Sequence, residues 1–131
     1  MQTMKCQIRL LMVLGTTICL ALVALAKQGT GVFYGPPYLP SSCYGYRNQG
    51  IMIAGDNPTV YDGGKACGRW YNVTCLGGTN NTPNPCKRGD IIVRIVDLCT
   101  RCGADEISLS RYAFSRIANL RAGRVRVEYT Q

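Results

Sequence analysis

Hydrophobic positions along the chain follow the period of strands more than that of helices. The longest β-branched run outside the N-terminus lies between Asp90 and Asp97, and because such side chains suit a buried, pleated surface, this run predicts a central strand. In residues 124–129, two valines and a tyrosine alternate with charged residues, which predicts a strand with one face in water.

Weaker patterns predict the remaining elements. Residues 51–54 are apolar between two glycines and predict a short buried strand, and residues 70–75 alternate and are rich in β-formers. Residues 32–34 can pair as a short strand, whereas the glycine-, proline- and asparagine-rich segments 56–65 and 76–88 predict loops.

One short helix is predicted over residues 111–119, where apolar side chains recur at helical spacing after Ser110, a suitable N-cap. No other segment has helical periodicity. Four or five strands around one helix favour an all-β fold, a small β-barrel.

The first 26 residues have the pattern of a secretory signal peptide. Two basic residues precede an apolar run that ends in Ala24-Leu25-Ala26, a small-x-small cleavage site. A transmembrane anchor is the alternative, but it needs about 20 apolar residues, and cleavage is the more economical interpretation. We therefore expect residues 1–26 to be removed and residues 27–131 to form one secreted, monomeric domain that does not span a membrane.

Charge and composition narrow the chemistry of this domain. The whole chain carries a net charge of +8, and loss of the two basic residues of the signal segment leaves +6. A basic exported domain is attracted to acidic polysaccharides or anionic membranes, and its export makes nucleic acid a poor partner. The chain has no histidine. This excludes Ser-His-Asp and Cys-His nucleophilic sites and removes the commonest metal ligand.

Six cysteines remain after residue 26, which indicates three disulfides but leaves 15 connectivities open. Cys99-x-x-Cys102 has the spacing of a redox pair or of half a zinc site. Zinc needs four ligands, which the chain does not offer, and a redox pair normally begins a helix in a βαβ setting. A structural disulfide is favoured, and we expect no metal and no cofactor.

The candidate binding residues are Asp97, where the central strand is predicted to reach the surface, and three aromatic residues. Tyr34, Tyr44 and Trp70 are candidates for an aromatic platform under sugar rings, but for any single tyrosine the more ordinary role is to pin a loop to a small core. For Asp97, the alternatives are a ligand contact and a strand-end carboxylate that accepts turn amides.

Two further surface features are predicted. Asn72 and Asn80 each begin a glycosylation acceptor sequence, and Asn80 lies in the more suitable loop. The C-terminal part also holds a basic cluster, which is either a solvated face or an attraction site for acidic polysaccharide or phospholipid, and which consists of Arg111, Arg116, Arg121, Arg124 and Arg126.

Several groups of residues follow one another in a familiar order: Cys43-Tyr44-Gly45, Ala66-Cys67-Gly68, the loop from Cys75 to Cys86, Ile95-Val96-Asp97-Leu98-Cys99, and Leu109-Ser110 with Ala113-Phe114 and Ile117-Ala118. In this order and spacing they resemble the expansin-like, family-45-endoglucanase-like domain of plants in its single-domain form, the type of the plant natriuretic peptides and the citrus blight-associated protein. The match spans essentially all of residues 27–131.

The resemblance implies a six-stranded double-psi β-barrel that is secreted to the apoplast and cell wall. It implies the disulfides Cys43–Cys67, Cys75–Cys86 and Cys99–Cys102. It also implies a non-enzymatic role in water and solute homeostasis or stress responses through a cell-surface receptor. The alternative is a module that binds wall polysaccharide, glucan or acidic pectin.

The chain departs from the family pattern at two positions. Ser108 stands where wall-loosening expansins and the endoglucanases have a second Asp, and Val32 stands where the family often has Thr. A glycosidase needs two carboxyls about 5 to 9.5 Å apart. Asp105 and Glu106 are the nearest substitutes, but in a strand Glu106 lies about 7 Å along from the required position. Asp97 therefore lacks its partner, and we expect no hydrolase activity.

Overall fold

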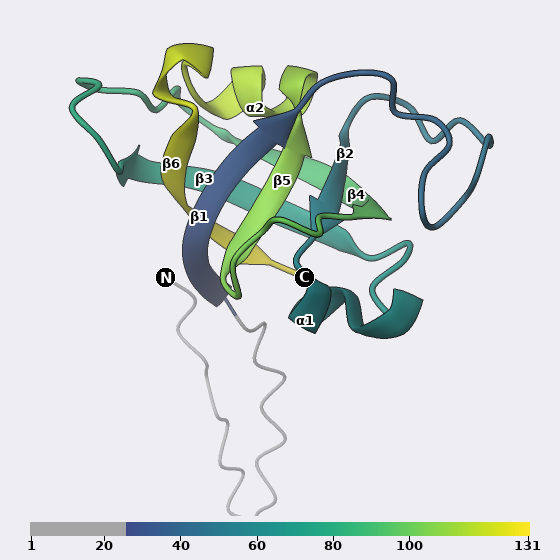
Figure 1. The fold of residues 1–131 in the computed structure, drawn as a ribbon. Helices are drawn as coiled ribbons and strands as arrows, with labels where there is room; N and C mark the ends of the chain where they lie inside the picture. Colours follow the sequence, from purple (N-terminus) through teal and green to yellow (C-terminus); the bar gives the residue numbers. More distant parts are fainter. Residues whose placement is uncertain (1–25) are drawn as a thin grey trace, which may run out of the picture.

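Six strands close into a barrel in the order β1-β5-β2-β4-β3-β6 (Figure 1). The computed structural model describes residues 26–131, so the predicted signal peptide lies outside the described residues, apart from its last residue. The strands are β1 Ala26–Tyr34, β2 Ile53–Asp56, β3 Trp70–Gly78, β4 Asp90–Leu98, β5 Glu106–Ser110 and β6 Arg124–Thr130. The helices are α1 Pro58–Tyr61 and α2 Arg111–Ile117, with short 3-10 turns η1 Asp62–Gly64 and η2 Leu120–Ala122.

Two parallel strand pairs define the topology. β1 pairs in parallel with β5 and β2 with β4, whereas the other four neighbouring pairs are antiparallel. The fold is the double-psi β-barrel that the resemblance implied. It has one or two strands more than the hydrophobic pattern revealed.

Three strand predictions need correction. β1 begins at Ala26 rather than at residue 32, because β5 and β6 on either side give its glycines and polar residues hydrogen-bonding partners. β2 begins two residues later than predicted, at Ile53, and Ile51 is half exposed. β3 continues to Gly78, into the predicted loop, because its last residues pair with β6.

The single predicted helix is joined by a second one. α2 begins after Ser110, whose Oγ accepts a hydrogen bond from Ala113 N at 3.0 Å, as predicted for an N-cap. α1 lies in a predicted loop: Asn57 Oδ1 accepts from Val60 N at 3.0 Å, and Pro58 follows as the first helical residue. An asparagine cap followed by proline is a helix start signal in the sequence.

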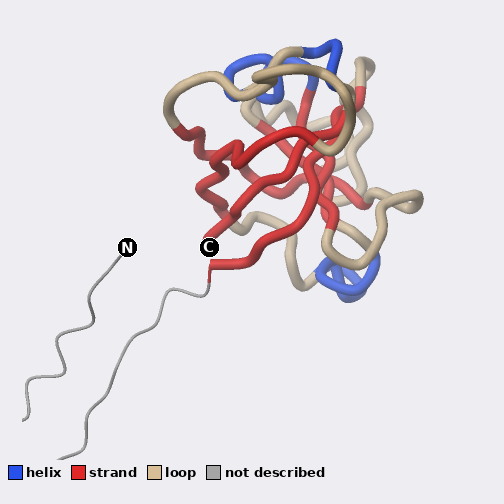
Figure 2. The backbone as a smooth tube through the Cα atoms, turned by 90° about the vertical axis from the view of Figure 1, so that its left-hand side faces the viewer, coloured by secondary structure: helices blue, strands red, loops and turns tan. Residues whose placement is uncertain are grey.

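The barrel interior is apolar, and a helix lies at each end of it (Figures 1 and 2). Phe114 of α2 packs against Phe33 with the rings tilted by 52° and their centroids 4.9 Å apart, and Tyr71 meets Tyr129 edge-on at 5.7 Å. Burial of each fully buried aliphatic side chain stabilises the fold by about 1.5 to 3 kcal/mol. The fully buried aliphatic residues include Val73, Val93, Ile95, Ile107, Leu109, Ile117, Val125 and Val127.

Three disulfides tie loop segments to one another or, through Cys75, to β3. They join Cys43 to Cys67, Cys75 to Cys86 and Cys99 to Cys102, the pairs that the resemblance implied. Within residues 26–131, no helix is long and apolar enough to cross a membrane.

Candidate functional site

A β-bulge in β4 turns Asp97 out of the barrel. Ala54 of β2 is paired with Ile95, but the next residue, Gly55, is paired with Asp97, so Val96 is an extra residue on β4. Side chains at odd positions point inward up to Ile95, and strict alternation would direct Asp97 into the core as well. The bulge shifts the alternation and leaves the carboxylate half-buried at the surface.

Gly55 lies between Asp97 and Ser108. It pairs with Asp97 on β4 and with Ser108 on β5, and Ser108 in turn pairs with Val32 on β1. Two strand spacings of about 4.8 Å separate the backbones of Asp97 and Ser108. Because Gly55 has no side chain, β2 places nothing between these two positions. A second acid at position 108 would therefore face Asp97 across one glycine.

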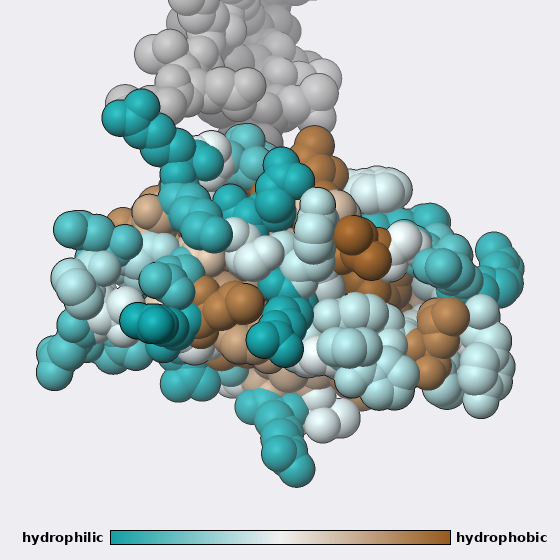
Figure 3. All heavy atoms as spheres, turned by 90° about the horizontal axis from the view of Figure 1, so that it is seen from above, coloured by the Kyte–Doolittle hydropathy of each residue, from teal (hydrophilic) through white to brown (hydrophobic). Residues whose placement is uncertain are grey.

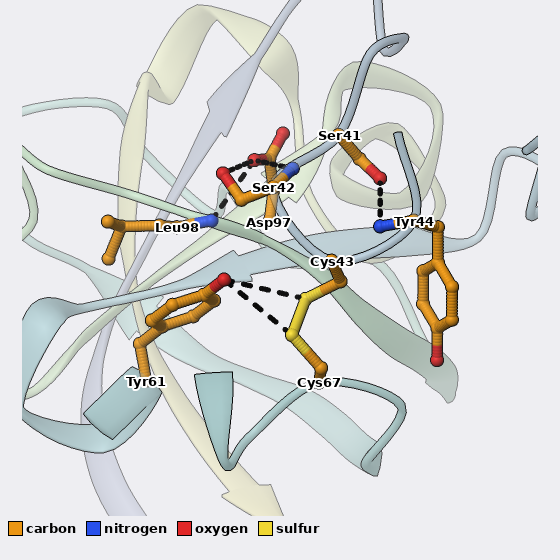
Figure 4. The surroundings of a disulfide bond; sticks show 8 residues. All are labelled: Ser41, Ser42, Cys43, Tyr44, Tyr61, Cys67, Asp97 and Leu98. Atoms are coloured by element: carbon orange, nitrogen blue, oxygen red, sulfur yellow. Dashed lines mark hydrogen bonds between the residues drawn. A yellow bond between two sulfur atoms is a disulfide. The ribbon is translucent and has the colours of Figure 1, made fainter. Parts of the chain in front are cut away.

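The long loop after β1 holds one oxygen of Asp97 (Figure 4). Asp97 Oδ1 accepts hydrogen bonds from Ser42 N at 3.0 Å, from Ser42 Oγ at 2.7 Å and from Leu98 N at 3.1 Å. This is the turn-capping role that was one of the two alternatives. Among the described residues no hydrogen bond reaches Oδ2, so this oxygen is available to a ligand.

Tyr34, the last residue of β1, lies beside Asp97. Burial, the Asp97 carboxylate and Tyr38 together raise the pKa of Tyr34 well above its ordinary value. Its ring meets Tyr38 edge-on at 5.2 Å, and its buried hydroxyl has no hydrogen-bond partner among the described residues. Tyr34 is therefore a neutral phenol next to a carboxylate, with an unused O–H donor.

Tyr44 and Trp70 form a second group, and the guanidinium of Arg94 lies between them. Arg94 Cζ is 4.9 Å from the centroid of the Tyr44 ring and 5.4 Å from that of Trp70, and Arg47 Cζ lies 5.7 Å from Tyr44. Trp70 is 55% exposed. These contacts make a cationic and aromatic surface.

The two arginines were missed by the sequence analysis. The available signal was that Arg94 interrupts the apolar run of β4, whereas its position opposite Trp70 follows only from the strand register.

Segment 41–45 connects the two groups along β4. Cys43 N donates to Val96 O at 2.9 Å, with Ser42 bound to Asp97 on one side and Tyr44 against Arg94 on the other. Asp97 and Arg94 are three residues, about 10 Å, apart on the strand. The four predicted residues thus form two neighbouring pairs, Tyr34 with Asp97 and Tyr44 with Trp70.

The two acids that precede Ser108 in the chain are already paired. Glu106 Oε2 accepts from Thr30 Oγ1 at 2.8 Å and lies 3.0 Å from Arg124 Nε, and it is two residues along β5 from Ser108. Asp105 lies 3.5 Å from Lys27 Nζ. Neither acid can serve as the partner of Asp97 without breaking its ion pair.

The basic cluster does not form one face. Arg124 is paired with Glu106, whereas Arg111 and Arg116 project from α2. The space-filling view from above, onto the end of the barrel that α2 covers in Figure 1, shows hydrophilic side chains around separate apolar patches (Figure 3).

The two glycosylation asparagines have different surroundings. Asn72 lies within β3, and its Nδ2 donates to Asp90 Oδ2 at 2.9 Å. Asn80 is exposed in the loop after β3, and its Nδ2 donates to Ala122 O at 2.9 Å. Glycosylation at both positions stays a prediction. Asn80 is the more suitable position because it lies in a loop and not in a paired strand.

Comparison with known proteins identifies relatives over most of the chain. The family model described as "Lytic transglycolase" matches residues 53–129. An "EG45-like domain containing protein" of Citrus jambhiri is 44% identical over 120 residues, covering 88% of this chain and 92% of that protein. "EG45-like domain containing protein 2" of Arabidopsis thaliana is 41% identical over 111 residues, covering 85% of each.

Two solved structures of an expansin from Clavibacter michiganensis share the fold. The apo form superposes with a TM-score of 0.65 at 20% identity, and a mutant in complex with cellohexaose with a TM-score of 0.66 at 21% identity. Each alignment covers 82% of this chain and 50% of the expansin chain, so this chain spans half the length of those proteins. The relatives confirm the resemblance, and the chain belongs to the family of expansin-like, EG45-like domain containing proteins.

Proposed function

We propose that this chain is an extracellular, non-hydrolytic member of its family. The observation that carries the proposal is the serine at position 108, across Gly55 from Asp97. Hydrolysis of a glycosidic bond needs two carboxyls, and the two acids that precede Ser108 in the chain, Asp105 and Glu106, are held in ion pairs. Errors of about 1 Å in a reacting group already cost about a hundredfold in rate, so an acid two residues along the strand does not substitute.

The description of the matching family model, "Lytic transglycolase", names a lytic cleavage and not a hydrolytic one. Asp97 would have to act alone, and its Oδ1 is bound by Ser42 and Leu98. Only Oδ2 is left for a substrate. This arrangement favours a binding contact over acid catalysis.

The test covers hydrolytic and lytic products together. The purified, oxidised domain is incubated with soluble β-glucan and with peptidoglycan, and released fragments are detected by mass spectrometry. We expect no fragments. Fragments from the wild type that disappear in Asp97→Asn would overturn the proposal. Ser108→Asp restores the family acid, and any gain of glucan binding or cleavage in this variant supports loss of an ancestral site.

The physiological role is in water and solute homeostasis or stress responses, exerted through a partner at the cell surface. Membership of the family supports this role, and three disulfides suit the oxidising extracellular space. Saturable binding to plant plasma membranes that protease treatment of the membranes removes is the expected result. Binding that persists after protease treatment would point to lipid instead and count against a receptor.

Binding of a wall polysaccharide is the second candidate, and the Trp70–Arg94–Tyr44 surface favours it. Aromatic faces supply large contact areas at low entropic cost, and two arginines add positive charge for an acidic polymer. The expansin structure with cellohexaose adds support from a protein of the same fold.

A pull-down on cellulose and on pectin tests this candidate. Trp70→Ala is expected to abolish retention, whereas Tyr112→Ala, which removes another exposed aromatic ring, leaves it unchanged. Equal retention of both variants would exclude the Trp70 surface as the site. Loss of pectin binding alone in added salt would identify charge as the main attraction.

A further inference from the structure

A cavity of about 310 Å³ lies between the long loop after β1 and the outer wall of the barrel. It is distinct from the open face that carries Asp97. Side chains from the loop and from two strands line it, among them Tyr38, Leu39, Arg47, Ile51, Ile53 and Val96. Its volume is at the lower end of the range for small-molecule sites.

Two residues of the barrel strands supply the floor of the cavity. Val96, the extra residue, lines the cavity together with Ile53 of β2, and both are almost fully buried. The floor is therefore apolar and built by barrel strands.

The loop is fixed on both sides of the cavity, so the cavity exists before any ligand binds. Tyr38 Oη donates to Tyr34 O and accepts from Arg111 N, both at 3.1 Å. At the other side, Ser110 Oγ donates to Ile51 O. Between these points the Cys43–Cys67 disulfide anchors the loop. Preformed walls lower the ordering cost of binding.

Among the described residues that line the cavity, Arg47 is the only charged one. Within residues 26–131 no carboxylate lies within ion-pair distance of it, although its guanidinium rests near the Tyr44 ring. A planar carboxylate matches a guanidinium with two parallel hydrogen bonds. One such cation beside an apolar floor matches a ligand that has one negative charge and an otherwise apolar structure.

We propose that this cavity binds a small monocarboxylic acid with an aromatic or aliphatic body, its carboxylate on Arg47 and its body on Val96 and Ile53. The volume equals that of roughly ten water molecules at about 30 Å³ each, which sets the size of the ligand. A sugar ring is a poorer fit because hydroxyls placed against the apolar floor would lose their hydrogen bonds to water. The site goes beyond the proposed function, although it shares Arg47 with the Trp70–Arg94–Tyr44 surface.

The experiment uses three probes of one shape and different charge: phenylpropanoate, phenylpropanamide and phenylpropylamine. Methyl signals of the full oxidised domain are followed by NMR during titration. We expect saturable shifts at Ile51, Ile53 and Val96 with the acid, about tenfold weaker affinity for the amide, and no binding of the amine. Shifts confined to the Trp70 surface, equal affinities of acid and amine, or no saturation would each overturn the proposal.

Matched variants separate the cavity from general surface charge. Arg47→Gln is expected to reduce the affinity for the acid to that of the amide. Arg121→Gln makes the same charge change on an exposed residue outside the lining and is expected to have no effect. If both variants weaken binding equally, net charge attracts the probe and the cavity is not its site. Ile51→Ala, at a half-exposed residue of the cavity wall, tests the apolar contact with little risk to folding. It should weaken the binding of both the acid and the amide.

Discussion

Asp56 is the buried acid whose ionisation the barrel opposes. Its side chain is fully buried, Oδ1 accepts from Asn57 N at 3.1 Å, and Oδ2 has no partner among the described residues. Burial raises the pKa of Asp56 to about 6, against smaller opposing effects of the Asn57 amide, Lys27 and Arg69. The fold therefore favours the protonated acid.

This shift predicts that the protein is more stable in acid than at neutral pH. Because the pKa is raised in the folded state, the stabilisation is complete below the unfolded pKa near 3.8 and is lost as the pH rises through about 6. The thermal midpoint should fall between pH 4 and pH 7, and Asp56→Asn should flatten this fall. Asp105→Asn replaces an exposed acid, so this variant should show the same fall in thermal midpoint as the wild type. A midpoint that rises over this range would contradict the assignment.

Gly68 allows Tyr44 to reach Arg94, and this predicts a second effect. The residue has φ of +83°, and a Cβ at this position would lie 2.7 Å from Tyr44 Oη. Gly68→Ala should therefore destabilise the fold by about 1 to 3 kcal/mol and displace the Tyr44 ring. Urea unfolding measures the loss. Gly103→Ala, which meets nothing within 4 Å, is the control, and equal midpoints for the two variants would refute the argument.

The residues of the candidate site were only partly predictable. Asp97 stood out as a carboxylate at the end of an apolar strand, and Tyr34, Tyr44 and Trp70 stood out as aromatic residues in short predicted strands and a loop. The structure brings these four residues together in two pairs. Arg94 and Val96 did not stand out, because a charge inside a strand usually faces water and a bulge has no simple sequence signature. Ser108 was informative only beside a family pattern that has an acid there.

Among the elements, α2 depends on one side chain that does two things. Ser110 Oγ caps the helix by accepting from Ala113 N, and it donates to Ile51 O across the barrel end. Ser110→Ala should cost about 1 to 2 kcal/mol by urea unfolding, because the cap and a second hydrogen bond, to Ile51 O, are lost together. Ser115→Ala removes a bond within one helical turn only and should cost less than about 0.5 kcal/mol. The reverse order would show that the cap is unimportant.

Elements that bury one face or both could be predicted from the sequence, whereas elements defined by their neighbours could not. β4, β6 and α2 have strong apolar patterns and appear close to the predicted bounds. β1 is half glycine and polar residues, and β5 contains two serines and a glutamate, so only pairing in the closed barrel makes them strands. For this reason the hydrophobic pattern suggested four or five strands instead of six.

At the scale of the whole molecule, the topology is what the sequence alone conceals. The parallel pairing of β1 with β5 joins Thr30 to Glu106, residues 76 apart in the chain. Such non-local contacts leave no periodic signal, and the family resemblance supplied them. The position of Ser108 relative to Asp97 follows from this topology, since β2 must lie between β4 and β5 for Gly55 to pair with both.

The disulfides offer a prediction for the whole chain, because they restrict the unfolded state. Cys43–Cys67 spans 24 residues, Cys75–Cys86 spans 11 and Cys99–Cys102 spans 3. In the chain-entropy model a loop of 15 residues gives about 3 kcal/mol, and longer loops give more.

Paired Cys→Ala variants should therefore lose stability in the same order, with more than about 3 kcal/mol for Cys43 and Cys67 and least for Cys99 and Cys102. The first pair also anchors the loop that carries Ser42 and Tyr44, so its removal should weaken ligand binding as well as the fold. Peptide mapping of the unreduced protein first establishes the three pairs. Urea unfolding of the three variants then gives their order of stability. If the variant without Cys99 and Cys102 is the least stable, the turn after Asp97 stabilises the fold through native contacts and not through loop closure.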